Sequence, residues 1–265
     1  MKTIRLGYIG PEVEIICKTL CLPEKNEYTQ DIEEKVKEYQ KVCGLKDDGI
    51  IGLNTWSHLL PSYREMTNPD PCVCDSDFSL FSDLLSISRA ALKAVIEVET
   101  AGRGGFIKGT DKPQILFEAN IFYQELKKEG KDPDKLMKEY PNLISRRWNK
   151  SLYLGGIKEW DRLEEAKKIS EEAALKSTSW GIFQIMGFNY SKCGCAGIYE
   201  FIDRMGRSEF QQFVLGLKFI LSCNLIPFLQ KRDWAGFALR YNGPGYKENN
   251  YDVRLERAFK KYSGK

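Results

Sequence analysis

The chain has 265 residues, of which 42% are hydrophobic and 12% aromatic, so it can bury a substantial core and is not expected to be disordered. Its 40 basic and 37 acidic residues leave a net charge of +3, which gives no indication of a nucleic-acid partner. No apolar run approaches the roughly 18 residues that cross a bilayer. Because Glu12 and Glu14 interrupt the apolar start, we expect no signal peptide and a soluble protein made in the cytoplasm.

The eight cysteines include two Cys-x-Cys pairs, Cys72/Cys74 and Cys193/Cys195. Without an export signal we expect reduced thiols. A zinc site built from the two pairs is an alternative, but paired zinc ligands usually have two or more residues between them, so we expect neither a metal nor another cofactor. The only histidine, His58, would have to serve every histidine-dependent mechanism, which disfavours metallohydrolases and Ser-His-Asp enzymes.

Residues 1–62 predict a small domain of three helices. Pro11 opens the first, because a proline in the first turn lacks only an N–H that would have no helical partner. Apolar side chains at helical spacing predict a second helix that ends at Gly44. Asn54 begins the third, which we expect to run to Leu60.

A proline-rich stretch separates this domain from the rest of the chain. Three prolines and several small polar residues lie between residues 61 and 77, so we assign 63–77 to a linker and 78–265 to a second domain. Periodicity and capping residues predict helices over 81–100, 117–128, 163–176, 208–228, 233–241 and 251–261, with an extended segment over 114–118. The expected fold class is mainly α, a small three-helix domain followed by a larger α-rich domain.

Glu99 lies at the end of the first of these helices. At about 100° per residue it projects onto the apolar face with Val95 and Ile96, whereas Glu97 projects to the opposite face and is expected to be solvated. Burial disfavours the charged carboxylate, and the negative end of the helix dipole acts in the same direction. We therefore expect a raised pKa for Glu99, which is what a general acid requires.

Three segments of the second domain form one pattern in chain order: Ala94-Val-Ile-Glu-Val-Glu99-Thr100-Ala-Gly102, Trp180-Gly-Ile-Phe-Gln184-Ile185 and Arg240-Tyr241-Asn242-Gly243-Pro244-Gly245. Their order and spacing resemble the catalytic core of the lysozyme-like superfamily. Goose-type lysozymes and soluble lytic transglycosylases of that superfamily carry a Glu-Ser pair at a helix end, then Gly-x-x-Gln-Ile, then Tyr-Asn. In this chain Thr100 takes the place of the serine.

Residues 81–262 resemble more closely the N-acetylmuramidase domain of modular phage endolysins. The motifs that carry this resemblance are Ile115-Leu-Phe-Glu118, Ser177-Thr-Ser179-Trp-Gly-Ile-Phe-Gln-Ile-Met-Gly-Phe-Asn189-Tyr190 and Tyr241-Asn242-Gly243-Pro244. The first domain resembles a three-helix peptidoglycan-binding module through Gly10-Pro-Glu-Val13, Tyr39-Gln40 and Asp48-Gly49-Ile-Ile-Gly52-Leu-Asn-Thr55-Trp56-Ser-His-Leu59. Residues 21–30 lack the additional Asp-Gly-x-x-Gly turn that members of that family often carry.

The resemblance implies cleavage of the bond between N-acetylmuramic acid and N-acetylglucosamine in peptidoglycan, with Glu99 as the proton donor to the leaving oxygen. Glu118 is the candidate second carboxylate, which would position the attacking water. The alternative for Glu118 is a glutamate at a helix N-terminus that the helix dipole stabilises. A separation of about 6.5–9.5 Å between the two carboxylates would favour inversion, and one near 5 Å retention.

Five further residues are candidates for substrate contacts: Gln184, Tyr241, Asn242, Ser179 and Ser177. The resemblance places Gln184 in the sugar-binding cleft, whereas a buried amide can also be purely structural. It places Tyr241 beside the acid, while Asn242 can equally serve a turn. Ser177 and Ser179 are either caps or hydroxyls of the cleft floor. We expect Trp180 in the core.

Two other functions stay open. A lytic transglycosylase would use the same acid but replace water by the muramic 6-hydroxyl, which leaves 1,6-anhydro ends. A non-catalytic virion protein would keep the fold and bind the wall without activity. Peptidoglycan is the expected partner in each case. We expect a monomer without nucleic acid or stable membrane association, held in the producing cell's cytoplasm until it is released to the wall.

Overall fold

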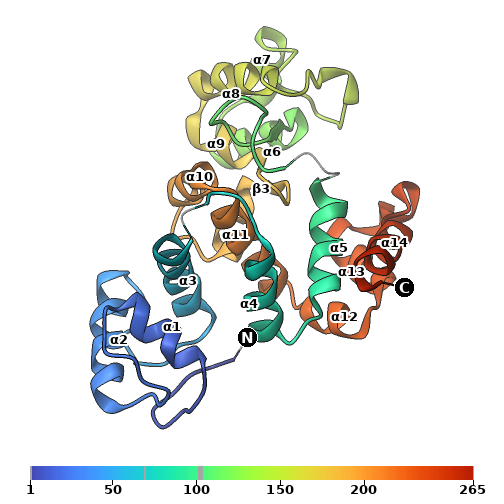
Figure 1. The fold of residues 1–265 in the computed structure, drawn as a ribbon. Helices are drawn as coiled ribbons and strands as arrows, with labels where there is room; N and C mark the ends of the chain where they lie inside the picture. The colour runs from blue at the N-terminus through green and yellow to red at the C-terminus, as the bar shows by residue number, and fades with distance from the viewer. Residues whose placement is uncertain (1, 69, 101–103, 265) are drawn as a thin grey trace. The chain divides into compact units, whose positions relative to one another are not determined.

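The computed structural model describes residues 2–68, 70–100 and 104–264. The chain divides into two compact units, Met1–Arg89 and Ala90–Lys265. Both consist mainly of helices, drawn as coiled ribbons in Figure 1, and the one sheet within the described ranges has three short strands. The predicted mainly α fold is confirmed. Across these ranges no helix combines the length and the apolar character that a membrane span requires.

The first unit contains the three predicted helices and a fourth. They are α1 (Glu12–Thr19), α2 (Gln30–Val42), α3 (Leu53–Thr67) and α4 (Asp75–Leu85). Pro11 precedes α1 as predicted. Gln40 of α2 is almost fully buried and holds the turn before α3: its Oε1 accepts from the N–H of Gly49 at 2.9 Å, and its Nε2 donates to the Ile50 carbonyl and the Thr55 hydroxyl, both at 3.0 Å. The motif residues of this unit therefore fix its fold.

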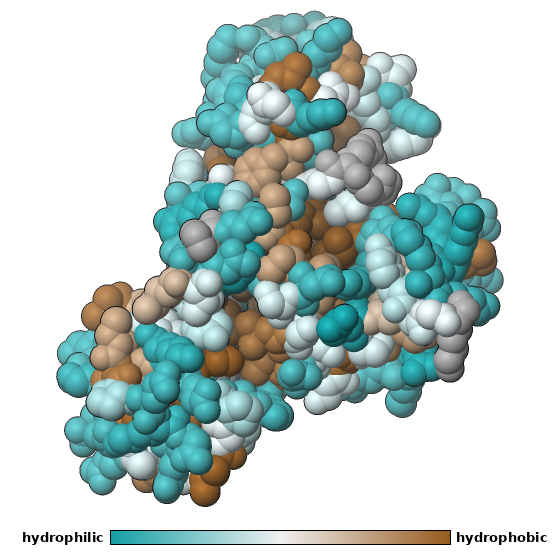
Figure 2. Space-filling model, in the orientation of Figure 1, coloured by the Kyte–Doolittle hydropathy of each residue, from teal (hydrophilic) through white to brown (hydrophobic). Residues whose placement is uncertain are grey.

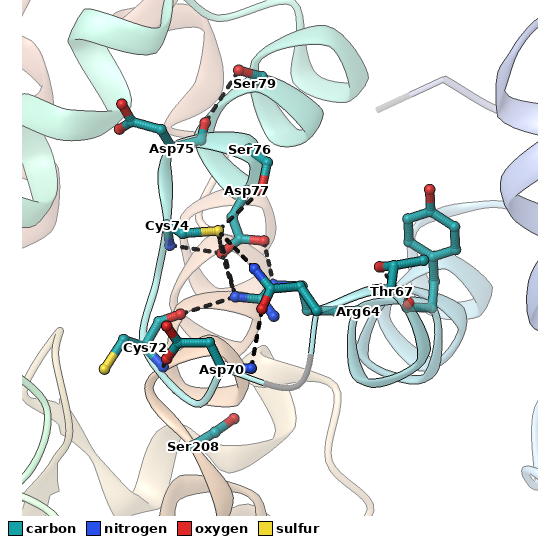
Figure 3. A network of polar contacts seen from close by, with 12 residues as sticks. Arg64, Thr67, Asp70, Cys72, Cys74, Asp75, Ser76, Asp77, Ser79 and Ser208 are labelled. Atoms are coloured by element: carbon teal, nitrogen blue, oxygen red, sulfur yellow. Dashed lines mark hydrogen bonds and ion pairs between the residues drawn. The ribbon is translucent and has the colours of Figure 1, made fainter.

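Residues 63–77, expected to form a linker, contain a buried ion pair (Figure 3). Helix α3 continues through Pro61, although a proline inside a helix removes one backbone hydrogen bond. On the turn that follows, Arg64 Nε donates to Asp77 Oδ1 at 2.7 Å, and both side chains are almost fully buried. Oδ2 of Asp77 accepts from the N–H of Cys74 at 2.8 Å. Tertiary contacts thus join the end of α3 to the start of α4.

The helix predicted over residues 81–100 is interrupted, which corrects that prediction. Ser86 follows α4 in the left-handed conformation with φ of 54°, and α5 (Arg89–Thr100) begins a new helix. Ser82 closes α4: its hydroxyl donates to the Ile87 carbonyl at 2.6 Å, and its carbonyl accepts from the N–H of Ile87 at 3.1 Å. Such local bonds compete with helix continuation. The division between the two compact units falls beside this break.

The second unit begins with α5 and continues through the remaining helices and strands. In chain order they are β1 (Ile115–Phe117), α6 (Ala119–Lys128), α7 (Pro133–Glu139), η1 (Lys150–Leu152), α8 (Lys158–Ile169), α9 (Glu171–Lys176), β2 (Thr178–Trp180), β3 (Ile185–Met186), η2 (Gly187–Cys193), α10 (Ile198–Arg207), α11 (Glu209–Ser222), α12 (Ile226–Lys231), α13 (Trp234–Asn242), η3 (Pro244–Asn249) and α14 (Tyr251–Ser263). Ser208 and Asp233 cap α11 and α13 as predicted. The single helices predicted over 163–176 and 208–228 are each divided in two, and α7 and α10 were not predicted.

The three strands form an antiparallel sheet in the order β1-β2-β3, in which Ile115 pairs with Trp180 and Trp180 with Ile185. Trp180 is fully buried, as predicted, and its indole N–H donates to the Leu175 carbonyl at 3.2 Å. Figure 1 shows α6–α9 grouped at one end of this unit and α5, α13 and α14 at the other, with β3 between them. The sheet therefore lies between two helical lobes.

Candidate active site

A cleft with a volume of about 140 Å³ lies where the end of α5 approaches the sheet. Several segments far apart in the sequence contribute its lining: Glu99, Thr100, Gly104, Gln114, Ile115, Leu116, Gly155, Gly156, Gly181, Ile182 and Gln184. Two predicted site residues, Glu99 and Gln184, thus line one cleft. Of the glycine-rich segment after Glu99, residues 101–103 lie outside the described part of the chain.

Glu99 combines cleft access with a buried oxygen. Its side chain is half-buried, and Oε1 has almost no accessible surface and no hydrogen-bond partner among the described residues. Burial raises the pKa of Glu99 to about 8, against the opposing effects of a hydrogen bond from Tyr251 and the positive charge of Arg254. The predicted direction of the shift is therefore confirmed. At neutral pH Glu99 is a protonated carboxylic acid, the state in which it can donate a proton.

Tyr251 and Arg254, both from the start of α14, were not predicted as site residues. Tyr251 is buried and donates its hydroxyl hydrogen bond to Glu99, while the side chain of Asn242 hydrogen-bonds to Tyr251 in turn. Arg254 donates to the carbonyl of Val98 at 3.0 Å, in the last turn of α5. Asn242 therefore reaches Glu99 through Tyr251, and Arg254 ties α14 to the end of the helix that carries Glu99.

Glu118 lies two residues beyond Leu116 of the cleft lining, between β1 and α6. Its side chain is half-buried and makes no capping bond to α6; instead Oε2 accepts a 2.5 Å hydrogen bond from the Tyr153 hydroxyl. Burial raises the pKa of Glu118, while the Tyr153 bond and the charge of Arg162 lower it. Glu118 is thus held by a side chain of the loop that follows η1 and not by its own helix.

Gln184 ties together two segments of the cleft wall. Its Nε2 donates to the carbonyls of Gly181 at 2.9 Å and Gln114 at 3.3 Å, and its Oε1 accepts from the Ser179 hydroxyl at 2.9 Å. The residue has a left-handed φ of 46°, which a non-glycine residue adopts only when its surroundings hold it. Gln184 therefore lines the cleft, and its amide bridges two segments of the cleft wall, while its contact with sugar stays a prediction. Ser179 helps to hold the cleft wall through its hydrogen bond to the Gln184 amide.

Comparisons with known proteins assign both units. The family model of N-acetylmuramidase matches residues 88–263. The chain belongs to the N-acetylmuramidase family. A peptidoglycan binding domain model matches residues 5–59, so the predicted modular organisation is confirmed and peptidoglycan is the partner. The crystal structure of Burkholderia AP3 phage endolysin is similar, with 37% identity, coverage of 100% of each chain and a TM-score of 0.67. A comparison with curated protein sequences gives no match.

In the muramidase domain, Tyr241 lies close enough to Glu99 for the two to interact electrostatically. Burial raises the pKa of Tyr241 well above its ordinary value; the ring stacks on Phe237, with 5.4 Å between centroids, and the hydroxyl donates to the Phe183 carbonyl at 3.3 Å. Ser177, in contrast, is fully buried and donates its hydroxyl to the Ala173 carbonyl at 2.6 Å. The structure does not bring Ser177 to the cleft, because its hydroxyl is used at the end of α9.

A buried amide that the sequence did not reveal, Gln212 of α11, holds another part of the muramidase cleft. Its Oε1 accepts from the N–H of Ile182 at 2.9 Å, and its Nε2 donates to the Gly105 carbonyl at 3.2 Å. A Cβ on Gly181 would lie 2.7 Å from this oxygen, and Gly181 also has a φ of 67°, so only glycine fits there. The glycine of the Trp-Gly-Ile-Phe-Gln motif therefore permits close approach of the backbone to Gln212.

The Gly155–Gly156 wall of the cleft is fixed by Glu159, which is fully buried. Oε1 of Glu159 accepts from the N–H groups of Leu154 at 2.6 Å and Gly155 at 3.0 Å, while Oε2 accepts from the N–H of Phe117 at 3.2 Å and from Arg162 at 2.8 Å. One buried carboxylate thus joins the loop to β1. Sequence reasoning missed it because Glu159 resembles its exposed neighbours on a charged helix.

The cysteines fall into both units of the chain. All eight lie in the described ranges and no disulfide joins any two of them: Cys72 and Cys74 are in the first unit, and Cys193 and Cys195 are buried in the muramidase domain. Within the described ranges no group of three or more His, Cys, Asp or Glu side chains is arranged to hold a metal ion.

Proposed function

We propose that this chain is an endolysin that hydrolyses the β-1,4 bond between N-acetylmuramic acid and N-acetylglucosamine, with Glu99 as the general acid. The observation that carries the proposal is the uncharged carboxyl of Glu99 at the cleft of a muramidase domain, with a pKa raised by burial to about 8. The Glu99 side chain lines this cleft, and no described residue accepts a hydrogen bond from its Oε1. Similarity to a phage endolysin over the full chain supports the biological role.

In the proposed reaction the Glu99 proton passes to the glycosidic oxygen as its bond to muramic C1 breaks, and positive charge develops at that carbon. The carboxylate that remains on Glu99 accepts the Tyr251 hydrogen bond and lies near the positive charge of Arg254. Both interactions favour the ionised form and therefore strengthen as the proton leaves. Tyr251 and Arg254, which lower the pKa of Glu99, thus also stabilise the carboxylate that proton transfer leaves behind.

We assign the second carboxylate to Glu118. As the base it would take a proton from the attacking water, whose oxygen becomes the new hydroxyl on C1. Its position directly after β1, next to the cleft lining, and the Tyr153 bond that favours its ionised form support this role. Gln184 and Ser179 would hold the wall on which the sugar packs, and Asn242 and Tyr241 would keep Tyr251 and Glu99 in place.

Product analysis tests the function. Purified peptidoglycan is digested with the full chain, and the released fragments are analysed by mass spectrometry with and without borohydride reduction. Hydrolysis gives muramic acid with a reducing end, which gains two hydrogens on reduction. A lytic transglycosylase gives 1,6-anhydromuramic ends, which do not, and a non-catalytic wall-binding protein gives no fragments. Either of the latter two results would contradict the proposal.

A further inference from the structure

The loop between α7 and α8 exposes large hydrophobic side chains. Within ten residues, Trp148 is 62% exposed, Leu154 57% and Ile157 42%. Figure 2 shows that the visible surface of the lobe formed by α6–α9 is otherwise mainly hydrophilic, with a few separate hydrophobic patches. Apolar side chains exposed beside a functional cleft mark a candidate site for binding a ligand or partner.

Although the Trp148 side chain is exposed, its contacts with Tyr153 hold it in one orientation. Its indole Nε1 donates to the Tyr153 hydroxyl oxygen at 2.7 Å, and the two rings meet edge to face with 6.3 Å between centroids. Because the Tyr153 oxygen accepts this bond, its single proton is directed to Glu118, at 2.5 Å. The indole edge is therefore fixed by hydrogen bonding.

The same loop forms part of the cleft wall. The N–H groups of Leu154 and Gly155 are held by Glu159, and Gly155 and Gly156 line the cleft. One residue, Leu154, separates Tyr153 from Gly155, which gives a span of at most about 7 Å between their Cα atoms. Trp148 is hydrogen-bonded to Tyr153 and therefore belongs to a surface that is continuous with the cleft.

We propose that Trp148 is a sugar-stacking residue that binds an N-acetylated aminosugar of the glycan strand outside the cleavage position. This inference rests on the proposed function, since it takes the glycan strand as the occupant of the cleft. Pyranose rings present an apolar C–H face, and a flat indole offers it a large contact area with only two side-chain torsions to immobilise. Because the Tyr153 bond already fixes the indole, little side-chain entropy is lost when a sugar binds.

The binding experiment uses the full chain with the substitution Glu99→Gln, so that the strand is not cleaved. A soluble glycan strand freed of its peptides is added, and quenching of tryptophan fluorescence by acrylamide is followed. Of the five tryptophans, Trp56 and Trp180 are fully buried, Trp234 is 9% exposed and Trp160 is half-buried, so Trp148, at 62%, is the most accessible to acrylamide. Bound sugar should protect it from acrylamide, and the double variant Glu99→Gln/Trp148→Phe should lose this protection.

The kinetic experiment compares Trp148→Ala, Trp148→Phe and wild type on long glycan strands. Trp148→Ala should lower kcat/KM about tenfold, mainly through KM, because stacking outside the cleavage site binds substrate and transition state alike. Trp148→Phe keeps an aromatic face but lacks the indole N–H that bonds to Tyr153, so its kcat/KM should fall less than that of Trp148→Ala. Tyr199→Ala removes a comparably exposed aromatic ring, 57% exposed on α10, and should change nothing.

The outcomes separate this inference from the proposed function. If wild type cleaves the strands but Trp148→Ala keeps its KM and the strand gives no protection, the stacking role is wrong and the function stands. A loss of kcat alone, equal in Trp148→Ala and Trp148→Phe, would instead assign Trp148 to the Tyr153–Glu118 contact and overturn the stacking role. Binding and protection without any cleavage by wild type would contradict the proposed function and leave the stacking role supported.

Discussion

Tyr251, the first residue of α14, donates a hydrogen bond to Glu99 near the end of α5. The bond favours the charged carboxylate, whereas burial favours the neutral acid, and burial prevails because the pKa of Glu99 is about 8. Such a balance suits a group that must hold a proton in the resting enzyme and release it during the reaction. Asn242, at the end of α13, hydrogen-bonds to Tyr251 in turn. Residues of α13 and α14 thus surround the carboxyl of a residue on α5 and influence its pKa.

The pH dependence of kcat/KM should be bell-shaped. Glu99 acts in its protonated form, so activity should fall with an apparent pKa of about 8 as the pH rises. Glu118 acts ionised, and because burial raises its pKa above the ordinary 4.5, the acid limb should lie above pH 4.5. Turnover of a soluble glycan strand between pH 4 and 10 measures both limbs. A rate that still rises above pH 9 would be incompatible with Glu99 as the acid.

Tyr251→Phe should shift the alkaline limb to higher pH. The variant loses the hydrogen bond that stabilises ionised Glu99, so the pKa of Glu99 rises and the acid stays protonated further into the alkaline range. The maximal rate should fall as well, by about tenfold, because the carboxylate formed in the reaction loses a donor. Tyr262→Phe is the matched control, since that hydroxyl donates to Glu97 instead. An alkaline limb that stays in place in Tyr251→Phe would disprove this role.

Tyr153→Phe should move the acid limb. Its hydroxyl lowers the pKa of Glu118, so the variant should need a higher pH to ionise the base and should lose activity chiefly below neutral pH. Tyr123→Phe removes a hydroxyl bonded to Asp134 at 3.0 Å and should leave both limbs unchanged. An unaltered acid limb in Tyr153→Phe would mean that Glu118 does not set it.

Glu99→Gln should stabilise the folded protein at neutral and alkaline pH. The folded pKa of Glu99, about 8, lies above the unfolded value near 4.5, so wild-type stability relative to the variant falls as the pH rises from 4.5 to 8. By pH 8 the variant should be more stable by a few kcal/mol, whereas near pH 4 the two should agree.

Urea unfolding at pH 4, 6 and 8 measures this difference, with Glu97→Gln as the control. Bonds from Lys261 and Tyr262 lower the pKa of Glu97, so its contribution has the opposite sign: it is present above the unfolded pKa and lost as the pH falls. Glu97→Gln should therefore weaken the fold at neutral pH. Equal stability of Glu99→Gln and wild type at every pH would show that Glu99 is not held neutral by burial.

Local patterns were sufficient to place Glu99 and the caps of several helices. The burial of Glu99 follows from the 3.6-residue period of α5, and Ser208 and Asp233 act through bonds to N–H groups three residues away. The family motifs predicted that Gln184 and Glu99 share a cleft. The helix and cap signals are local, and the shared cleft came from motifs of a known family.

Contacts between distant segments could not be predicted in this way. Tyr251 bonds to a residue on a helix far away in the chain, and nothing in its own sequence neighbourhood marks it as part of the site. Gln212 and Glu159 look like ordinary polar residues of helices until the backbone groups they hold are known. The end of α3 was also mispredicted: the helix runs past Pro61, against the local preference of proline, and the ion pair of Arg64 with Asp77 joins its last turns to the start of α4.

The most direct test of the central claim is the rate at which Glu99→Gln forms reducing ends from purified peptidoglycan. Glutamine keeps the size of the side chain but has no proton of comparable acidity to give, so the account predicts a loss of at least about a thousandfold in kcat, with binding to the wall retained. The folded state and wall pelleting of the variant serve as controls in the same preparation. A variant that is folded, binds the wall and releases reducing ends at a rate within about tenfold of wild type would contradict the assignment of Glu99 as the acid.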